Sequence, residues 1–189
     1  MRHRMTLFAA LVLGTAAHAV VLPTGTYSFR TYGAESGLHG LSAMRLAQDS
    51  AGFIWVATQE GLYRYDGTRF EHFEQGVPSS LVTTVRAAPN GEVWAGTQGG
   101  VTRWDGRRFH EIPSLPHSAT NAIAIDGESR VWVAVPEGLY AGSSSRPFAP
   151  VQGWPAATEA TAVWSDAGDI YAAAFGTIGV FRGGSFWLA

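Results

Sequence analysis

The sequence predicts an all-β fold, a β-propeller built from four-stranded antiparallel blades. The first observation is a short phrase that repeats at nearly equal spacing, with Trp55, Trp94 and Trp132 at the same place in each copy. A fourth copy carries Tyr171 there, one further period along the chain. A second series in the same register consists of phenylalanines, at Phe70, Phe109, Phe148 and Phe186. A fixed period of about 40 residues indicates one stacked supersecondary unit, because a single unit cannot bury its own apolar surface.

The first repeat contains four short runs of β-forming residues. The first two, residues 43–48 and 53–58, are separated by the turn signal Asp-Ser-Ala-Gly. Gly61 precedes the third run, residues 62–65, and an Asp-Gly pair leads into the fourth, residues 68–73. Asp-Gly between two apolar runs is a strong hairpin signal, since both central positions of that turn favour positive φ. Each repeat is therefore expected to form four antiparallel strands.

The second run of each repeat decides how the sheets pack. In the first repeat, Phe53, Trp55 and Ala57 point to one side of the strand, while Ile54 and Val56 point to the other. Both faces are apolar, so the sheet must be covered on both sides. A four-stranded sheet that packs between copies of itself is a propeller blade. Helical repeats of this length would show a period of about 3.6 residues, which the sequence lacks.

The chain is expected to hold a partial β-propeller over residues 20–189, with repeats at approximately 38–76, 77–114, 115–153 and 154–189. Residues 27–32 are predicted to form an extra outer strand. Four blades stand at the lower limit of closed rings. We therefore expect these blades to be part of a larger, seven-bladed-type ring, and the natural chain to continue into further repeats. In residues 20–189 alone, the sheet faces around Ile54 and Ile170 would be open and apolar, and would promote oligomerisation or aggregation.

Residues 1–19 are predicted to be a signal peptide. Arg2 and Arg4 give a positive start, residues 7–13 are apolar, and Ala17-His18-Ala19 is a small-x-small cleavage site. The alternative is an uncleaved membrane anchor, although the apolar run is shorter than the about 20 residues that span a bilayer. The mature chain is expected to begin near Val20 and to be exported, with no other membrane span in these residues.

The composition excludes several kinds of chemistry. The chain has no cysteine, so its stability must come from buried apolar area and not from disulfides. All 13 basic residues are arginine, which excludes P-loop phosphate binding and Schiff-base chemistry, because both need a lysine. Without the signal peptide, 11 arginines stand against 15 carboxylates, a net charge of −4. This acidic balance argues against a nucleic-acid partner.

The sequence assigns no catalytic, cofactor-binding or metal-binding residue, and the ligand-binding residues are unknown. Trp55, Trp94 and Trp132 could form an aromatic ligand cage, but their mid-strand positions favour the core. Trp154 occupies a loop position, where it could be exposed and bind a ligand. The histidines at positions 39, 72, 110 and 117 lack metal-ligand spacing. The expected place for a ligand is the loop set at one end of the propeller, which includes the turns 59–60, 98–99 and 136–137.

The repeated phrase resembles the two-component regulator propeller repeat. The residues that carry the resemblance are Asp49-x-x-Gly52-Phe-Ile-Trp55-Val-Ala-Thr58-x-x-Gly61-Leu-Tyr-Arg-Tyr65-Asp66-Gly67. The upstream segment Phe29-Arg-Thr-Tyr32, followed by Ser36-Gly37-Leu38, resembles the start of such domains. The resemblance covers residues 27–189 and is strongest in the first two repeats, because the third replaces Asp-Gly by Ala141-Gly142 and the fourth replaces tryptophan by Tyr171.

The resemblance implies a periplasmic ligand-sensing propeller of an inner-membrane signal-transduction receptor, of the two-component or cyclic-di-GMP type. In that family, the propellers often have seven blades and precede a transmembrane helix and a cytoplasmic histidine kinase or diguanylate cyclase. The resemblance further implies a small-molecule or glycan ligand and a homodimer formed through the full-length receptor. It implies no cofactor and no catalysis in this region. Two alternatives stay open: an extracytoplasmic propeller enzyme, either a lyase or a glycan-active protein, and a protein-docking scaffold. An enzyme would need a convergent acid and base set on the loop face.

Overall fold

The computed structural model describes residues 28–182 and 184–188, so the predicted signal peptide over residues 1–19 lies outside the described residues. The chain divides into two units, Met1–Thr31 and Tyr32–Ala189. In the first unit, residues 28–31 have no regular secondary structure. Within the described residues, no helix combines the length and the apolar character that crossing a bilayer requires.

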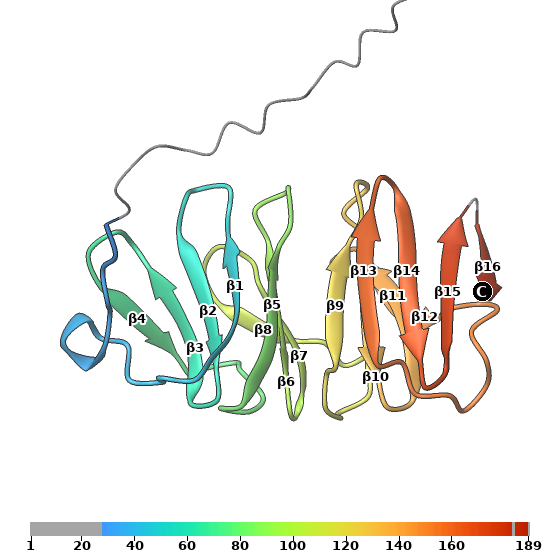
Figure 1. Cartoon of the computed structure of the whole chain (residues 1–189), viewed down its shortest axis with the longest axis horizontal. Helices are drawn as coiled ribbons and strands as arrows, with labels where there is room; N and C mark the ends of the chain where they lie inside the picture. Colours follow the sequence, from blue (N-terminus) through green and yellow to red (C-terminus); the bar gives the residue numbers. More distant parts are fainter. Residues whose placement is uncertain (1–27, 183, 189) are drawn as a thin grey trace, which may run out of the picture. The chain divides into compact units, whose positions relative to one another are not determined.

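The second unit confirms the predicted fold, because its described strands form four separate four-stranded antiparallel sheets (Figure 1). Sheet 1 contains β1 (Ala43–Gln48), β2 (Ile54–Thr58), β3 (Gly61–Tyr65) and β4 (Phe70–Phe73). Sheet 2 contains β5 (Val82–Ala87), β6 (Val93–Thr97), β7 (Gly100–Trp104) and β8 (Phe109–Glu111). Sheet 3 contains β9 (Ala122–Ile125), β10 (Val131–Val135), β11 (Gly138–Ser143) and β12 (Arg146–Pro150). Sheet 4 contains β13 (Ala162–Asp166), β14 (Asp169–Ala174), β15 (Thr177–Arg182) and β16 (Ser185–Leu188). In every sheet the strands pair in chain order, which is the topology of a propeller blade.

Three apolar cores lie between successive sheets. Trp55 packs against Trp104 and Phe109 of sheet 2, with ring centroids 5.7 and 5.8 Å apart. The mid-strand tryptophans of sheets 2 and 3 repeat this contact with Phe148 and Phe181 of the next sheet, at 5.7 and 4.8 Å. All three mid-strand tryptophans are fully buried, which confirms that they belong to the core and not to a ligand cage.

The predicted outer strand over residues 27–32 is wrong for the part that the structure describes, since residues 28–32 form no strand. Tyr32 instead makes side-chain contacts with sheet 1. Its ring lies edge-on to Tyr65 and Phe70, with centroids 5.1 and 5.7 Å away. The short 3-10 helix η1 (Ala34–Ser36) follows at once. The sequence predicted that this segment would pair with the sheet as a strand. The structure shows instead that the ring of Tyr32 covers this part of sheet 1.

Polar side chains at the beginning of the first strands join neighbouring sheets. The Thr83 hydroxyl lies 3.0 Å from the Gly96 carbonyl oxygen of its own sheet and 2.7 Å from the Thr120 carbonyl oxygen in the link before β9. At the next interface, the Asn121 amide donates to the Ala160 carbonyl oxygen at 2.9 Å. The Thr83–Thr120 contact crosses from sheet 2 to the link that precedes sheet 3, and the Asn121–Ala160 bond joins that link to the one that precedes sheet 4. The sheets are thus tied by hydrogen bonds as well as by apolar packing.

The open face of sheet 4 differs from the expectation. Ile170, which was expected on that face, is buried in the core between sheets 3 and 4. Neighbouring residues of a strand point to opposite faces, so Tyr171 lies on the open face in its place. Tyr171 pairs with Trp164 on β13 and with Val180 on β15. The open face therefore carries an aromatic and apolar row.

Candidate ligand-binding surface

The sheet topology places one set of turns and all the links between sheets at the same edge. In a four-stranded antiparallel meander, the first and third strands run in the same direction. The turn between the second and third strands therefore lies at the edge where the link to the next sheet begins (Figure 1). The turns 59–60, 98–99 and 136–137 occupy this edge, together with residues 175–176 of sheet 4. We call it the loop edge.

A buried threonine fixes two of these turns. The Thr58 hydroxyl donates to the Gly61 carbonyl oxygen at 2.8 Å and accepts the Glu60 N–H at 3.1 Å. Thr97 makes the same pair of bonds in sheet 2, at 2.9 and 3.0 Å. Gly61 adopts a φ of 144°, a backbone conformation that favours glycine. These side-chain bonds hold the turn backbone, while the turn side chains point to solvent.

The side chains of the loop edge are acidic or neutral. Glu60 and Glu137 are exposed, and Glu137 accepts a hydrogen bond from the Ser118 hydroxyl at 2.7 Å. Glu159, in the link before sheet 4, accepts a hydrogen bond from the Asn121 amide at 2.9 Å. The four turns contain no arginine. Carboxylates and amides in this arrangement are hydrogen-bond partners for hydroxyl groups, so the edge suits a polyhydroxyl ligand better than an anion.

Two grooves open along this edge. One, of about 360 Å³, lies beside the link between sheets 1 and 2 and is lined by Glu60, His72 and Ser79 among others. The second, of about 240 Å³, lies beside sheet 4 and includes Trp154 and Phe175. Trp154 is half-buried, and its indole Nε1 donates to the Thr158 carbonyl oxygen at 2.8 Å. The indole is thus held in place by the fold, with one side available to the groove.

Two histidines with carboxylate partners line a third groove, of about 700 Å³, at the outer strands of sheets 1 and 2. His72 stacks on Tyr63 and lies 3.4 Å from Glu74. His110 Nε2 lies 2.7 Å from Asp105 Oδ2. The pKa of the Asp105 carboxyl lies well below its usual range, because the carboxylate accepts hydrogen bonds from the Arg108 backbone N–H, the His110 side chain and the Arg107 backbone N–H. Among residues 28–182 and 184–188, no three histidine, aspartate or glutamate side chains gather as a metal site would require.

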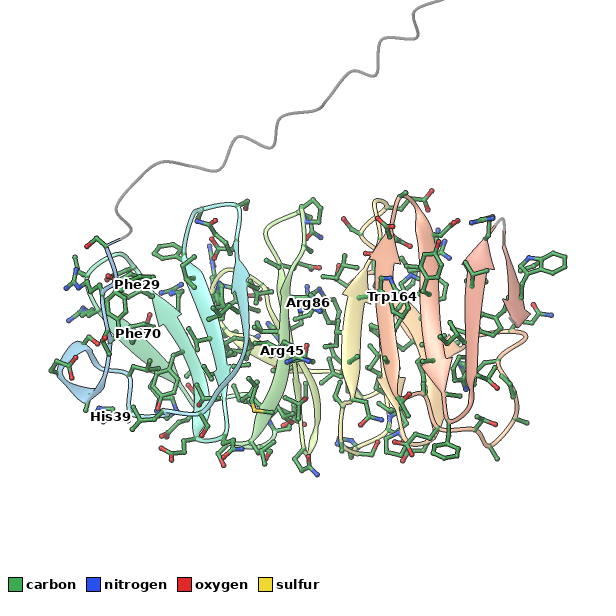
Figure 2. The ribbon with its side chains drawn as sticks, viewed as in Figure 1. Phe29, His39, Arg45, Phe70, Arg86 and Trp164 are labelled. Atoms are coloured by element: carbon green, nitrogen blue, oxygen red, sulfur yellow. The ribbon has the colours of Figure 1, made fainter. Side chains whose placement is uncertain are left out.

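Two arginines lie close together on the first strands of sheets 1 and 2. Figure 2 labels Arg45 on β1 and Arg86 on β5. Burial lowers the pKa of the Arg86 guanidinium, and the positive charge of Arg45 lowers it further. Each guanidinium donates to a carbonyl oxygen of the preceding residue, Met44 or Val85. Neither arginine forms an ion pair with a carboxylate in the described part of the chain. The pair is therefore a concentration of positive charge on the first strands of sheets 1 and 2.

Sequence reasoning missed a second role of two turn aspartates. Asp49 and Asp126 shape turns, and each also accepts a hydrogen bond from a buried indole, that of Trp55 or Trp132. The available signal was an aspartate at the same place before the tryptophan in two repeats. The groove that contains His72 and His110 was also missed, because it joins outer strands of different repeats.

No protein-family model matches the chain, and no curated protein matches it. Solved structures, in contrast, do match the chain. The extracellular domain of the hybrid two component system BT3049 from B. thetaiotaomicron has a TM-score of 0.67 at 22% identity, over 83% of this chain and 26% of that one. The extracellular domain of the one component system BT4673 of the same organism has a TM-score of 0.67 at 18% identity, over 78% of this chain and 22% of that one.

A virginiamycin B lyase from Staphylococcus aureus also has a similar structure, with a TM-score of 0.63 at 15% identity, over 78% of this chain and 55% of that one. The chain thus spans about a quarter of the two extracellular domains and about half of the lyase. At these identities, the similarity establishes the propeller fold.

Proposed function

We propose that the chain is a ligand-sensing propeller module of a membrane signal-transduction receptor, located in the periplasm and without catalysis in these residues. The observation that supports it most is the structural similarity to the extracellular domains of two bacterial signalling systems. The repeated phrase Asp49-x-x-Gly52-Phe-Ile-Trp55, which resembles the two-component regulator propeller repeat, supports the same function. The output domain that accompanies such a module would be a histidine kinase or a diguanylate cyclase.

The loop edge is the surface that we propose for the ligand. Threonine hydrogen bonds hold two of its turns, its carboxylates Glu60 and Glu137 are exposed, and grooves open beside it. Trp154 supplies an aromatic wall on which the apolar face of a sugar ring could pack. A neutral saccharide combines hydroxyl groups for the carboxylates with an apolar face for the indole. A small glycan is therefore the ligand class that this edge fits best.

Calorimetric titration of the chain with a panel of neutral mono- and oligosaccharides tests the proposal. At least one saccharide should bind, and the variants Glu60→Gln and Glu137→Gln should weaken it, by about tenfold where a charged hydrogen bond is lost. Glu128→Gln is the matched control, because Glu128 lies in the turn between the first and second strands of sheet 3, at the opposite edge. Disruption of the gene should also abolish the transcriptional response of the cell to the same saccharide. Binding that survives both loop-edge variants would place the ligand elsewhere, and a panel without any binder would contradict the proposed ligand class.

A lyase is the second candidate. It is supported by the fold similarity to virginiamycin B lyase and by the groove in which His72 and His110 each have a carboxylate partner. One similar structure is a catalytically inactive histidine-to-alanine form of that lyase with quinupristin, so a histidine is essential to that enzyme. His110, with its Asp105 partner, is the candidate acid or base in this chain. Incubation with quinupristin, followed by mass spectrometry of the products, tests this candidate. Cleavage that His110→Ala abolishes would favour the lyase over the sensor.

A further inference from the structure

The fourth repeat departs from the others at its turn on the loop edge. In sheets 1 and 2, a threonine ends the second strand, and a glycine with a φ of 144° or 131° begins the third. Sheet 4 has Ala174 and Thr177 at these two positions, which pair across the turn as Thr58 pairs with Gly61. The turn of sheet 4 therefore lacks the threonine hydroxyl that fixes the turns of sheets 1 and 2.

Sheet 4 also carries smaller side chains on the face that it turns toward sheet 3. Gly179, on its third strand, stands where sheets 1 and 3 have the tyrosines Tyr63 and Tyr140. Ala174 stands where sheet 3 has Val135. These smaller residues leave room between sheet 4 and the link that precedes it.

That link carries a larger residue than the other links. Trp154 occupies the position that aliphatic residues hold before the other sheets, Leu38, Val77 and Leu115. The indole donates to the Thr158 carbonyl oxygen and lies edge-on to Phe186, with ring centroids 5.3 Å apart. Together with sheet 4 it bounds the groove of about 240 Å³ described above, which we call the Trp154 groove. All residues that line this groove belong to sheet 4 or to the link between sheets 3 and 4, so it does not depend on the open face of sheet 4.

The chemistry of the Trp154 groove is neutral. Among the described residues, none with a charged side chain lines it. Its walls include aromatic rings and alanine methyl groups, and the polar side chains that line it are those of Thr158 and Thr177. The Thr177 hydroxyl has no hydrogen-bond partner in the part of the chain that the structure describes. A group that fits this groove is therefore uncharged, with an apolar end for the alanines and an acceptor for the hydroxyl.

The volume of the groove limits the size of that group. Pockets that enclose drug-sized ligands measure about 300–1,000 Å³. A groove of about 240 Å³ therefore suits one substituent of a ligand that lies along the loop edge.

We propose that the Trp154 groove binds the acetamido group of an N-acetylhexosamine, so that the glycan recognised at the loop edge is N-acetylated. This inference rests on the proposed ligand class, a small neutral glycan, and narrows it. The acetamido methyl group packs against Ala172 and Ala174, and the acetamido carbonyl oxygen accepts a hydrogen bond from the Thr177 hydroxyl. The sugar ring then lies against the Trp154 indole, with its hydroxyl groups toward the exposed Glu159 of the same link. A sugar with a hydroxyl in place of the acetamido group leaves the apolar walls in contact with water.

Calorimetric titration of the chain with two matched disaccharides measures this preference. N,N′-diacetylchitobiose and cellobiose have the same rings and linkage, and the first carries acetamido groups where the second has hydroxyls. The acetylated disaccharide should bind at least about tenfold more tightly, because it gains a buried methyl group and a hydrogen bond.

Two variants test whether the preference arises in the Trp154 groove. Ala174→Val should abolish most of it, because the two added methyl groups fill the groove; Val135 already holds the equivalent position in sheet 3. Thr177→Val removes the hydroxyl at nearly constant volume and should reduce the preference about fivefold. Ser80→Val is the matched control, since Ser80 lines the other groove of the loop edge, and it should leave the preference unchanged. Circular dichroism checks that each variant is folded.

The outcomes separate this inference from the proposed function on which it rests. Equal binding of the two disaccharides would overturn the inference and leave a neutral glycan as the ligand. A preference that survives both Ala174→Val and Thr177→Val would also overturn it, because the acetamido group would then bind elsewhere. If neither disaccharide binds but another neutral saccharide does, the inference fails alone; if no saccharide binds, both fail.

Discussion

The Oδ2 atom of Asp49 accepts a hydrogen bond from the indole Nε1 of Trp55 at 2.8 Å. The Oδ1 atom of the same carboxylate accepts two N–H groups of the turn between β1 and β2, both at 3.0 Å. Asp126 repeats the arrangement for Trp132, at 3.1 Å. One carboxylate therefore shapes a turn and also satisfies the polar atom of a tryptophan that the core buries.

Sheet 2 lacks this carboxylate. Its equivalent position is Ala88, and no described residue accepts a hydrogen bond from the indole Nε1 of Trp94. The turn backbone is nevertheless the same, because the Gly91 N–H donates to the Ala88 carbonyl oxygen at 3.0 Å, as the Gly52 N–H does to Asp49. We predict that Ala88→Asp raises the free energy of unfolding by about 1 kcal/mol, the contribution of a typical hydrogen bond. Urea unfolding at constant protein concentration measures it.

The opposite substitution in sheet 3 is the matched control for this prediction. Asp126→Ala leaves the buried Trp132 indole without an acceptor and should lower the free energy of unfolding by about 1–3 kcal/mol. If Ala88→Asp destabilised the protein while Asp126→Ala had no effect, the account of the aspartate–indole pair would be wrong.

Trp94→Ala should lower the free energy of unfolding by about 3–5 kcal/mol, because it empties a large aromatic side chain from a packed core. Chemical unfolding monitored by circular dichroism checks this value. Trp187→Ala is the control, since Trp187 is exposed and its loss should change the free energy by less than about 0.5 kcal/mol. Equal effects of the two substitutions would contradict the packing described here.

Arg45→Glu should stabilise the protein, since it replaces a repulsion by an attraction at the half-buried Arg86. The expected gain in the free energy of unfolding is about 0.5–1 kcal/mol at low salt, as for a partly exposed ion pair. The neutral variant Arg45→Gln should give an intermediate value, and added salt should reduce both gains. Thermal unfolding at two salt concentrations measures the effect. A loss of stability in both variants would show that Arg45 stabilises the fold in some other way.

Acid should weaken the turn between β3 and β4. Hydrogen bonds from the Thr68 hydroxyl and from the Arg69 and Thr68 backbone N–H groups lower the pKa of the Asp66 carboxyl from 3.8 to about 2. A carboxyl whose pKa is depressed in the folded state contributes stability above its unfolded pKa, and this contribution is lost as the pH falls through the folded value. The melting temperature should therefore decrease between about pH 4 and pH 2, and the decrease should be smaller in Asp66→Asn. An unchanged pH profile in that variant would contradict the assignment.

Most of the sheet architecture could be predicted from the sequence, because the repeated phrase determines local geometry. The predicted run 43–48 is β1, and the other three runs of the first repeat differ from β2, β3 and β4 by one or two residues at the start. Asp-Gly and Gly61 mark turns whose backbone conformation few other residues adopt. Alternation along the second strand predicted sheets covered on both faces, and the tryptophans are buried accordingly.

The features that depend on contacts between repeats could not be predicted. Residues 27–32 have the composition of a strand, but Tyr32 covers sheet 1 through its ring. His72 and His110 line one groove although they belong to different repeats, and Arg45 acts on Arg86 across two sheets. Period and alternation describe one sheet at a time, whereas these relations depend on how far a side chain reaches into the neighbouring sheet.

The Thr83 hydroxyl has one proton to donate and lies between the carbonyl oxygens of Gly96 and Thr120, so it couples sheet 2 to the link that precedes sheet 3. A protein whose units touch only their neighbours loses structure from its ends inward, since an end unit has one interface to break and an inner unit has two. Amide protons of β6 and β10 should then exchange with solvent more slowly than those of β2 and β14. Replacement of Thr83 by valine would uncouple sheets 2 and 3 in part, and it would divide one protected block into two of unequal exchange rates.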